Sequence, residues 1–282
     1  MNTKAIQSQM KAIKGIGKIT KTMEMVSVAK MRRTSKRAEE GRPYEVAVRE
    51  LVASIPSNIV AQHSLVEDRV NATGQVIVFV AADKGLCGGY NSQLIRTLSE
   101  LVRKNPDSKI VTVGKTADKL VRRTGASIIA SFGMLPELLD TGEVAAIAHY
   151  VVNLYRSDTS IRSITVLSQW LETKISSKPV QTPLLPISSI RRSSDVQLST
   201  EYRIEPNAPE LLSTLLPGYV ESELFQIILE ARAAEHTTRM IAMKSASDNA
   251  TEYYKELNVS FNRLRQASIT QEIAEIIGGA SV

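Results

Sequence analysis

Apolar residues near the start of the chain recur at spacings of three and four, which is the period of an amphipathic helix. The pattern predicts one helix over residues 3–56, in which Pro43 introduces a kink and Pro56 ends the helix. At 1.5 Å per residue this helix is about 80 Å long, too long for the interior of a compact domain. Lysines lie on roughly the opposite face: Lys4, Lys11, Lys14, Lys18 and Lys21. The apolar stripe consists of Ile6, Met10, Ile13, Ile16, Ile19, Met23 and Val26.

The middle of the chain has a different period. After a polar stretch over 57–74, short apolar runs alternate with helical patterns, which is typical of an α/β domain with a largely parallel, Rossmann-like sheet. We place this domain at 75–187, followed by a linker at 188–208 that is rich in Ser, Arg and Pro. The predicted strands are 75–82, 109–114, 126–132 and 163–169, and the stretch from there to residue 187 is predicted to be extended. The predicted helices are 91–104, 115–124 and 142–155.

A helical pattern returns over 209–282 and runs into Gly278-Gly279. Pro217-Gly218 is predicted to interrupt it early. Beyond that point, alternating spacings of three and four form a heptad seam with several small residues. The predicted seam consists of Met243, Ala246, Ala250, Tyr253, Leu257, Ser260, Leu264, Ala267, Gln271 and Ala274.

The apolar stripe of the N-terminal helix and the seam of the C-terminal helix are suitable surfaces for packing against each other. We predict an antiparallel intramolecular coiled coil of segments 1–56 and 209–282, with the α/β domain inserted between them and the longer C-terminal helix projecting past its partner. A helical dimerisation arm satisfies the same periodicity, so the pattern alone leaves both arrangements open.

The positive charge of the chain belongs to its N-terminal segment. Residues 1–37 hold ten Lys or Arg and one acid, Glu24, for a charge of +9. The whole chain carries +6, so the remainder is 25 basic against 28 acidic residues, or −3. Such a segment fits nucleic acid, a membrane surface or an acidic protein partner. An organelle transit peptide is a further alternative, although the segment is Lys-rich rather than Arg-rich.

Three features could indicate enzyme chemistry, and each lacks a required part. The run DKGLCGGYN, 83–91, follows a strand but does not have the spacing of a dinucleotide-binding loop. Gly114-Lys115-Thr116 lacks the earlier glycine of a phosphate-binding loop, because position 109 is Lys. Cys87 is the single cysteine, and none of the three scattered histidines has catalytic or metal-ligand spacing with it. We therefore expect no catalytic residue, no cofactor and no metal.

Four segments resemble one family, the gamma chain of F-type ATP synthases of the bacterial type. They are KAIQSQMKAIKGIGKITKTMEMVSVAKMRR at the start, DKGLCGGYNS after the first strand, RMIAMKSASDNA in the C-terminal helix and RQASITQEIAEIIGGA at the end. They occur in the family's order over the whole length. Plant-type members carry an inserted cysteine pair, and this chain has only Cys87. Thiol regulation of that kind is therefore not expected.

The resemblance implies a non-catalytic shaft. In this family the terminal helices form a coiled coil inside a hexamer of alternating alpha and beta chains, and ATP chemistry occurs on the beta chains. The globular domain and the epsilon chain sit on the membrane ring of c chains, which proton flow turns. The implied location is the cytoplasmic face of the bacterial plasma (inner) membrane, as a peripheral protein without nucleic acid or a small-molecule substrate of its own.

The same resemblance implies contact residues for the beta chains. Lys30, Arg32 and Arg33 match family positions near acidic lever loops, as does the glycine-rich turn with Lys84 and Cys87. Arg265 and Gln266 match residues that contact the beta chains further along the C-terminal helix. Without the resemblance, the first alternative is a nucleic-acid-binding protein with a basic arm, although residues 1–37 contain no aromatic residue for base stacking. A nucleotide enzyme that uses the glycine-rich turn is the next alternative.

Overall fold

The computed structural model describes residues 3–55, 57–60, 63–137, 139–173, 176–187, 205 and 207–279. The chain divides into two compact units, Lys30–Thr238 and Met1–Ala29 with Arg239–Val282. Both long helices continue from one unit into the other. These two units cut across both long helices, whereas the predicted ranges 1–56, 75–187 and 209–282 keep each terminal helix whole. The predicted domain ranges therefore stay a prediction. Most of the predicted linker 188–208 lies outside the described residues.

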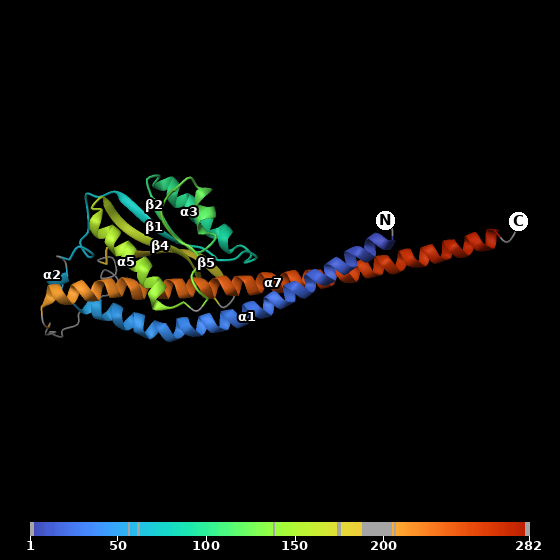
Figure 1. Cartoon of the computed structure of the whole chain (residues 1–282), viewed down its shortest axis with the longest axis horizontal. Helices are drawn as coiled ribbons and strands as arrows, with labels where there is room; N and C mark the ends of the chain where they lie inside the picture. Colours follow the sequence, from blue (N-terminus) through green and yellow to red (C-terminus); the bar gives the residue numbers. More distant parts are fainter. Residues whose placement is uncertain are drawn as a thin grey trace. The chain divides into compact units, whose positions relative to one another are not determined.

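The unit Lys30–Thr238 is built on a five-stranded sheet with the strand order β3-β2-β1-β4-β5 (Figure 1). The first four strands pair in parallel, and β5 pairs antiparallel with β4 at one edge. The predicted α/β class with a largely parallel sheet is confirmed, and β5 falls in the stretch predicted only as extended. The strands are β1 (Gly74–Val80), β2 (Lys109–Val113), β3 (Ser127–Phe132), β4 (Ile161–Leu171) and β5 (Ser177–Leu185).

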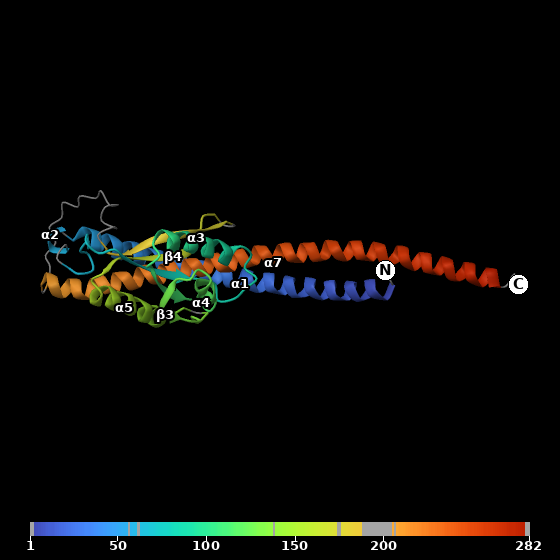
Figure 2. The same cartoon turned by 90° about the horizontal axis from the view of Figure 1, so that it is seen from above.

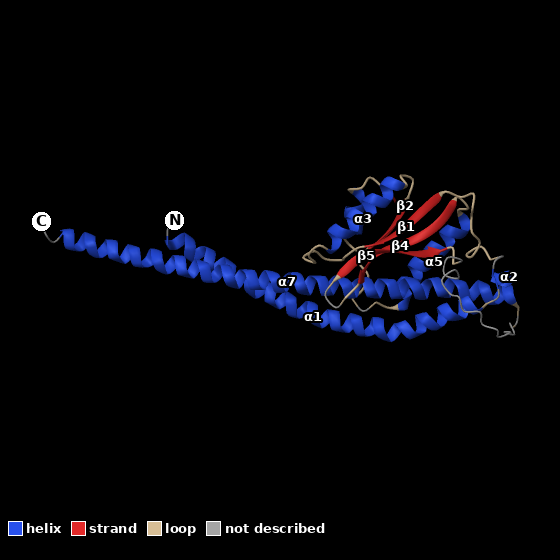
Figure 3. Ribbon diagram, turned by 180° about the vertical axis from the view of Figure 1, so that it is seen from behind, coloured by secondary structure: helices blue, strands red, loops and turns tan. Residues whose placement is uncertain are grey.

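Helices cover both faces of this sheet (Figure 3). Alternate β1 residues separate into two buried clusters, because successive strand side chains point to opposite faces. Val76, Val78 and Val80 pack with α5 (Thr141–Ser157), whereas Ile77 and Phe79 pack with the other helices. Those other helices are α3 (Tyr90–Lys104) and α4 (Ala117–Arg122). Burial on both faces explains why the strands read as continuous apolar runs. A short helix, α2 (Ser57–Val60), precedes β1.

Helices α1 (Thr3–Ser54) and α7 (Ala208–Gly279) run antiparallel within this unit. Arg42 forms an ion pair with Glu230 at 2.9 Å, and Arg49 forms one with Glu223 at 2.6 Å. The partner's residue number on α7 therefore falls as the residue number on α1 rises, which is the pattern of an antiparallel pair. Together they cover the α5 side of the sheet, where Leu212, Leu216 and Val220 of α7 join its buried cluster.

The predicted interruption at Pro217 is wrong, because α7 continues through it from Ala208. A proline inside a helix removes one backbone hydrogen bond and costs about 3 kcal/mol. The residues around it, Leu216, Tyr219 and Val220, are almost completely buried. Burying side chains of this size stabilises by about 1.5–3 kcal/mol each, which is enough to hold the helix together. Pro43 also lies inside a helix, α1, and the predicted kink at that residue stays a prediction.

In the other unit, Met1–Ala29 with Arg239–Val282, α1 and α7 lie side by side (Figures 1 and 2). The predicted apolar stripe of α1 is only partly correct. Ile6 is buried and Met10 and Ile13 are half-buried, but Ile16, Ile19 and Val26 are exposed. The buried or half-buried positions continue instead through Gly17, Thr20 and Ser27. The five lysines predicted on the opposite face are all exposed.

The small side chains at this seam allow a close approach of the helices. A Cβ added at Gly17 would lie 3.6 Å from the Cβ of Ala250. On α7 the seam also has a different phase from the predicted one. It passes through Ser247 and Tyr254, whereas the predicted Tyr253 is exposed and Ala246 is half-buried, and it keeps Met243, Ala250 and Leu257. Residues 265–277 are all exposed, including Gln271 and Ala274 of the predicted seam, and α7 extends past the start of α1 (Figure 2).

Candidate functional site

The glycine-rich loop after β1 presents an exposed tip on a buried base. Lys84, Gly85 and Leu86 are exposed, whereas Cys87 is buried beneath them. Leu86 has a φ of 60°, an uncommon left-handed conformation for a side chain of this size. Its apolar side chain is 62% exposed. The loop therefore has a strained backbone at the position where it exposes an apolar residue and a lysine to solvent.

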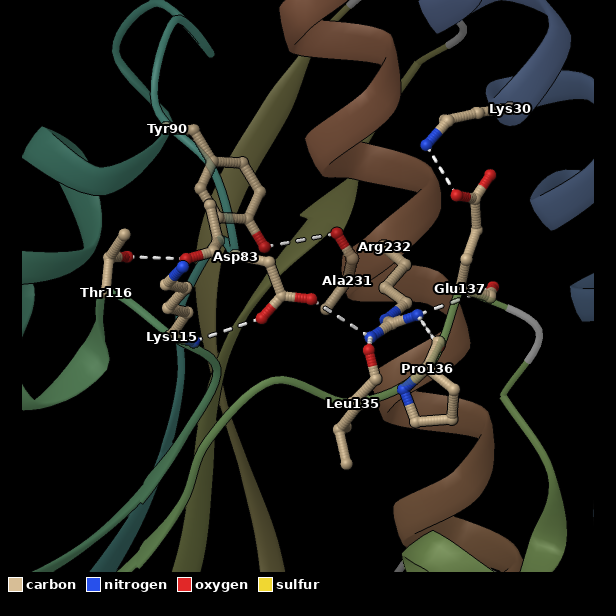
Figure 4. Close-up of polar contacts among 11 residues, drawn as sticks. Lys30, Asp83, Tyr90, Lys115, Thr116, Leu135, Pro136, Glu137, Ala231 and Arg232 are labelled. Atoms are coloured by element: carbon tan, nitrogen blue, oxygen red, sulfur yellow. Dashed lines mark hydrogen bonds and ion pairs between the residues drawn. The ribbon is translucent and has the colours of Figure 1, made fainter.

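Arg232 of α7 fixes the base of this loop (Figure 4). Its Nη2 atom forms an ion pair with Asp83 Oδ2 at 3.1 Å and donates to the Leu135 carbonyl at 2.9 Å. Its Nη1 atom donates to the Pro136 carbonyl. The side chains of Arg232 and Asp83 are only 11% and 19% exposed, so both charges depend on this pairing. The loop after β1 and the segment after β3 are thereby attached to the same turn of α7.

The other end of the loop is attached to the same helix. The Tyr90 hydroxyl donates to the Ala231 carbonyl at 3.1 Å, one residue from Arg232 (Figure 4). The Tyr90 side chain is almost completely buried, so this bond satisfies a hydroxyl that has left water. Cys87 joins the same buried cluster, which explains its burial by packing.

Gly114-Lys115-Thr116 forms a tight turn against this loop. Gly114 has a φ of 102°, and a Cβ at this position would lie 2.4 Å from the Ala81 carbonyl oxygen. The Lys115 amide donates to Asp83 Oδ1 at 3.0 Å, and the Thr116 hydroxyl donates to the Ala82 carbonyl at 2.5 Å. These three residues therefore have a packing role in joining β2 to the loop after β1.

A cationic cleft lies between α1 and the segment after β3. It is lined by Lys30, Arg33 and Arg37 of α1, with Glu137 and Arg232 opposite. Lys30 Nζ donates to Glu137 Oε2 at 2.6 Å (Figure 4). This hydrogen bond holds the pKa of the Glu137 carboxyl below its ordinary value, so Glu137 is ionised at neutral pH. The cleft keeps a positive excess around this single carboxylate.

The predicted contact residues fall into both units. Lys30, Arg32, Arg33, Lys84 and Cys87 belong to Lys30–Thr238, where Arg32, Arg33 and Lys84 are exposed. Arg265 and Gln266 belong to the other unit and are exposed on α7. Nothing in the chain alone tests their contacts with other chains, so this assignment stays a prediction.

Two features of the site were not predicted. Arg232 and Glu137 are separated by about a hundred positions in the sequence, and neither belongs to a recognisable motif. Three glutamates, Glu45, Glu223 and Glu230, are buried where α1 meets α7. In the sequence, the helical periodicity could have placed these glutamates on the buried face of an amphipathic helix. Across the described ranges, no group of three or more His, Cys, Asp or Glu side chains could hold a metal ion.

The fold and the site define a class of protein in which an antiparallel helical pair carries an inserted α/β domain and presents charged side chains. The family model described as ATP synthase matches residues 2–282. The ATP synthase gamma chain of Desulfitobacterium hafniense is 37% identical over 279 residues, which cover 98% of this chain and 97% of that one. The gamma chain of Desulforamulus reducens is 35% identical over 277 residues, with the same coverage. The chain belongs to the ATP synthase gamma chain family, which confirms the resemblance inferred from the four segments.

Solved structures share the fold. A chain of the Euglena gracilis mitochondrial ATP synthase rotor has a TM-score of 0.70 at 17% identity, covering 95% of this chain and 98% of that chain. A chain of the Tetrahymena thermophila central stalk and c-ring structure has a TM-score of 0.66 at 24% identity, covering 81% and 99%. The predicted combination of long terminal helices with an α/β domain is therefore a fold known from central-stalk proteins.

Proposed function

We propose that this chain is the central rotor shaft of an F-type ATP synthase. It transmits torque between the proton-driven membrane ring of c chains and the catalytic beta chains. The observation that carries this proposal is the identity of 37% with a gamma chain over 98% of the sequence. The paired helices α1 and α7 supply the structural element that such a role requires.

In this proposal the chain performs no catalysis and binds no cofactor. Its partners are the alpha and beta chains of the catalytic hexamer, the epsilon chain and the c-ring, and it is needed for ATP synthesis and for regulation of ATPase activity and proton flow. Within the described part of the chain, no helix combines the length and apolar character required to cross a membrane. We place it at the cytoplasmic face of the bacterial plasma membrane, held there by its partners.

Exposed apolar residues support an enclosing partner for the helical pair. Ile16 and Ile19 of α1 are 49% and 61% exposed, and Ile269, Ile273 and Ile276 of α7 are also exposed. Apolar side chains on a helix away from its own seam indicate a protein contact when they recur along one element. A surrounding hexamer would cover these positions. The small, partly polar seam inside the pair would keep the shaft slender.

The contact residues are assigned to two places. Lys30, Arg32, Arg33 and Lys84 present positive charge to acidic loops of the beta chains, and buried Cys87 supports the loop that presents Lys84. Arg265 and Gln266 make contacts further along α7. Lys30 is already paired with Glu137, so Arg32 and Arg33 are the more accessible cations of the set.

Reversing the charge of Arg32 and Arg33 together is expected to weaken coupling. The variant Arg32→Glu with Arg33→Glu would place like charges opposite acidic loops, which costs several kcal/mol at an interface. We expect ATP-driven proton pumping per ATP hydrolysed to fall at least about threefold in membrane vesicles. Pumping and hydrolysis are measured on the same vesicles that carry the whole complex.

The chain offers a matched control for this test. Arg122 and Arg123 form another exposed arginine pair, at the end of α4. Arg122→Glu with Arg123→Glu changes the net charge equally and should leave the pumping ratio unchanged. Equal ratios for both double variants would remove Arg32 and Arg33 from the interface.

A further inference from the structure

Buried carboxylates interrupt the helical seam in the unit Lys30–Thr238. Glu45 of α1 is 7% exposed, and Glu223 and Glu230 of α7 are 5% and 8% exposed. Each lies where α1 and α7 meet, at a position that apolar residues normally occupy in a helical pair. Removing a charge from water costs several kcal/mol unless a partner compensates it, so the partners of these carboxylates determine their protonation state.

The guanidinium of Arg49 contacts two of these carboxylates. Arg49 Nη2 lies 2.5 Å from Glu45 Oε1 and 2.6 Å from Glu223 Oε1. The Nε atom of Arg49 also donates to Glu223 Oε1, at 3.0 Å. Because the same nitrogen contacts both, the carboxyl groups of Glu45 and Glu223 are adjacent. The Tyr219 hydroxyl donates to Glu223 Oε1 at 2.8 Å, which adds a neutral donor to the Glu223 side only.

The neighbouring charges do not balance this cluster. Arg42 of α1 forms an ion pair with Glu230 Oε1 at 2.9 Å. Gln226, on α7 itself, donates to the same oxygen at 2.9 Å. Glu39 beside Arg42 is exposed and contributes one more negative charge. From β4, the ring of Trp170 faces Arg42 at 5.8 Å and carries no charge. Arg42 is therefore engaged by Glu230, and Arg49 alone faces two carboxylates.

We propose that Glu45 and Glu223 share one proton in the folded chain, and that loss of this proton at higher pH weakens the pairing of α1 with α7. A proton between adjacent carboxyl groups replaces repulsion with a hydrogen bond and leaves one negative charge for Arg49. The inference does not depend on the proposed role in an ATP synthase. It assigns a pH-sensitive element to the helical seam of this unit.

The direction of the pH effect follows from the two states of the chain. Burial, and then the charge of Glu223, raise the pKa of Glu45 to about 7. In the unfolded chain a glutamate has a pKa of about 4.3. Between these values the folded chain binds more protons, so folding becomes less favourable as pH rises. The stabilisation is complete below the unfolded pKa and is lost as pH rises through about 7.

Urea unfolding of the full chain at several pH values tests this proposal. Trp170 is the only tryptophan and lies beside Arg42, so its fluorescence reports unfolding in this unit. One released proton changes the folding equilibrium constant about tenfold per pH unit. From pH 5.5 to 7.5, we expect the constant of the unmodified chain to fall at least about tenfold relative to that of Glu45→Gln. Glutamine retains the shape of the protonated acid and cannot lose the proton.

Two further variants sharpen the result. Glu223→Gln should weaken the same pH dependence, because it removes the Glu223 charge and leaves Arg49 to Glu45, while the burial of Glu45 remains. Glu40→Gln is the control, because Glu40 is an exposed residue of α1 that pairs with Lys36 on the surface, and its pH dependence should match the unmodified chain. A constant ratio between the unmodified chain and Glu45→Gln at all pH values would show that Glu45 is ionised throughout and would overturn the proposal.

A measurement on the unmodified chain covers the case in which a variant does not fold. With carbon-13 at the glutamate carboxyl groups, at least one signal from the Glu45–Glu223 pair is expected to titrate near neutral pH. Completion of all glutamate titrations below pH 5.5 in the folded chain would also overturn the proposal.

Discussion

Replacing Arg232 with alanine is expected to lower the free energy of unfolding by about 3–5 kcal/mol. The guanidinium of Arg232 is the partner of Asp83, and it also binds carbonyl groups of the segment after β3. Its removal leaves the largely buried carboxylate of Asp83 without this cation and leaves the Leu135 carbonyl without this donor. The loss is measured by urea unfolding, again with Trp170 fluorescence, because Trp170 and Arg232 belong to the same unit.

Arg96 provides the matched control. It lies in α3 with a side chain that is 85% exposed, and its pairing with Glu100 at 3.7 Å is a surface contact. Exposed pairs contribute about 0–1 kcal/mol, so Arg96→Ala should change stability by no more than that. Similar small losses for Arg232→Ala and Arg96→Ala would mean that the Asp83 contact does not fix the loop.

Replacing Gly114 with alanine is expected to cost about 3 kcal/mol or more. The first contribution is backbone strain, because Gly114 has a φ of 102°. The second is a steric clash, because the added Cβ would lie 2.4 Å from the Ala81 carbonyl oxygen, a backbone atom of the loop that leads into Asp83. The same fluorescence-detected unfolding measures the loss.

Two other glycines separate these contributions. Gly125 has a φ of 76° with open space around it, so Gly125→Ala carries the backbone strain alone, about 1–3 kcal/mol. Gly142 lies in α5 with no atom within 4 Å of an added Cβ, so alanine there should be neutral or stabilising. If Gly114→Ala cost no more than Gly125→Ala, the contact with Ala81 would not constrain the turn.

The strands and helices of the α/β domain could be predicted because their signals are local. Runs such as VIVFV are too apolar for any position other than a sheet that is covered on both faces, and that is where β1 lies. Pro217 was misjudged because the local cost of a proline is visible in a sequence, whereas the burial of Leu216 and Tyr219 against other elements is not.

The helical seam was harder to predict because its residues are small. From Ile13, both Ile16 and Gly17 satisfy a helical spacing, and hydrophobicity favours Ile16. The seam passes through Gly17, which lies against Ala250, while Ile16 is exposed. A strict alternation of four and three from Ile6 reaches Gly17 and Thr20, so regular spacing was the better guide here. Hydrophobicity instead marked residues that we assign to an outside partner.

The candidate site was predictable only where the family resemblance reached it. Lys30 and Lys84 were selected by matching motifs, but the resemblance did not show that Lys30 pairs with Glu137. Glu45 and Arg49 lie four positions apart on α1, but the pairings of Asp83 with Arg232 and of Glu223 with Arg49 join residues far apart in the sequence. Such pairs depend on how the elements pack, and one sequence contains no signal for them.

The most direct test of the rotor role is the composition of the complex that contains this chain. A tag on this chain allows native purification from its own cells, followed by intact-complex mass spectrometry. The proposal predicts one copy of this chain together with three alpha and three beta chains. Recovery of the chain alone or as a homodimer, with nucleic acid retained at low salt, would contradict it.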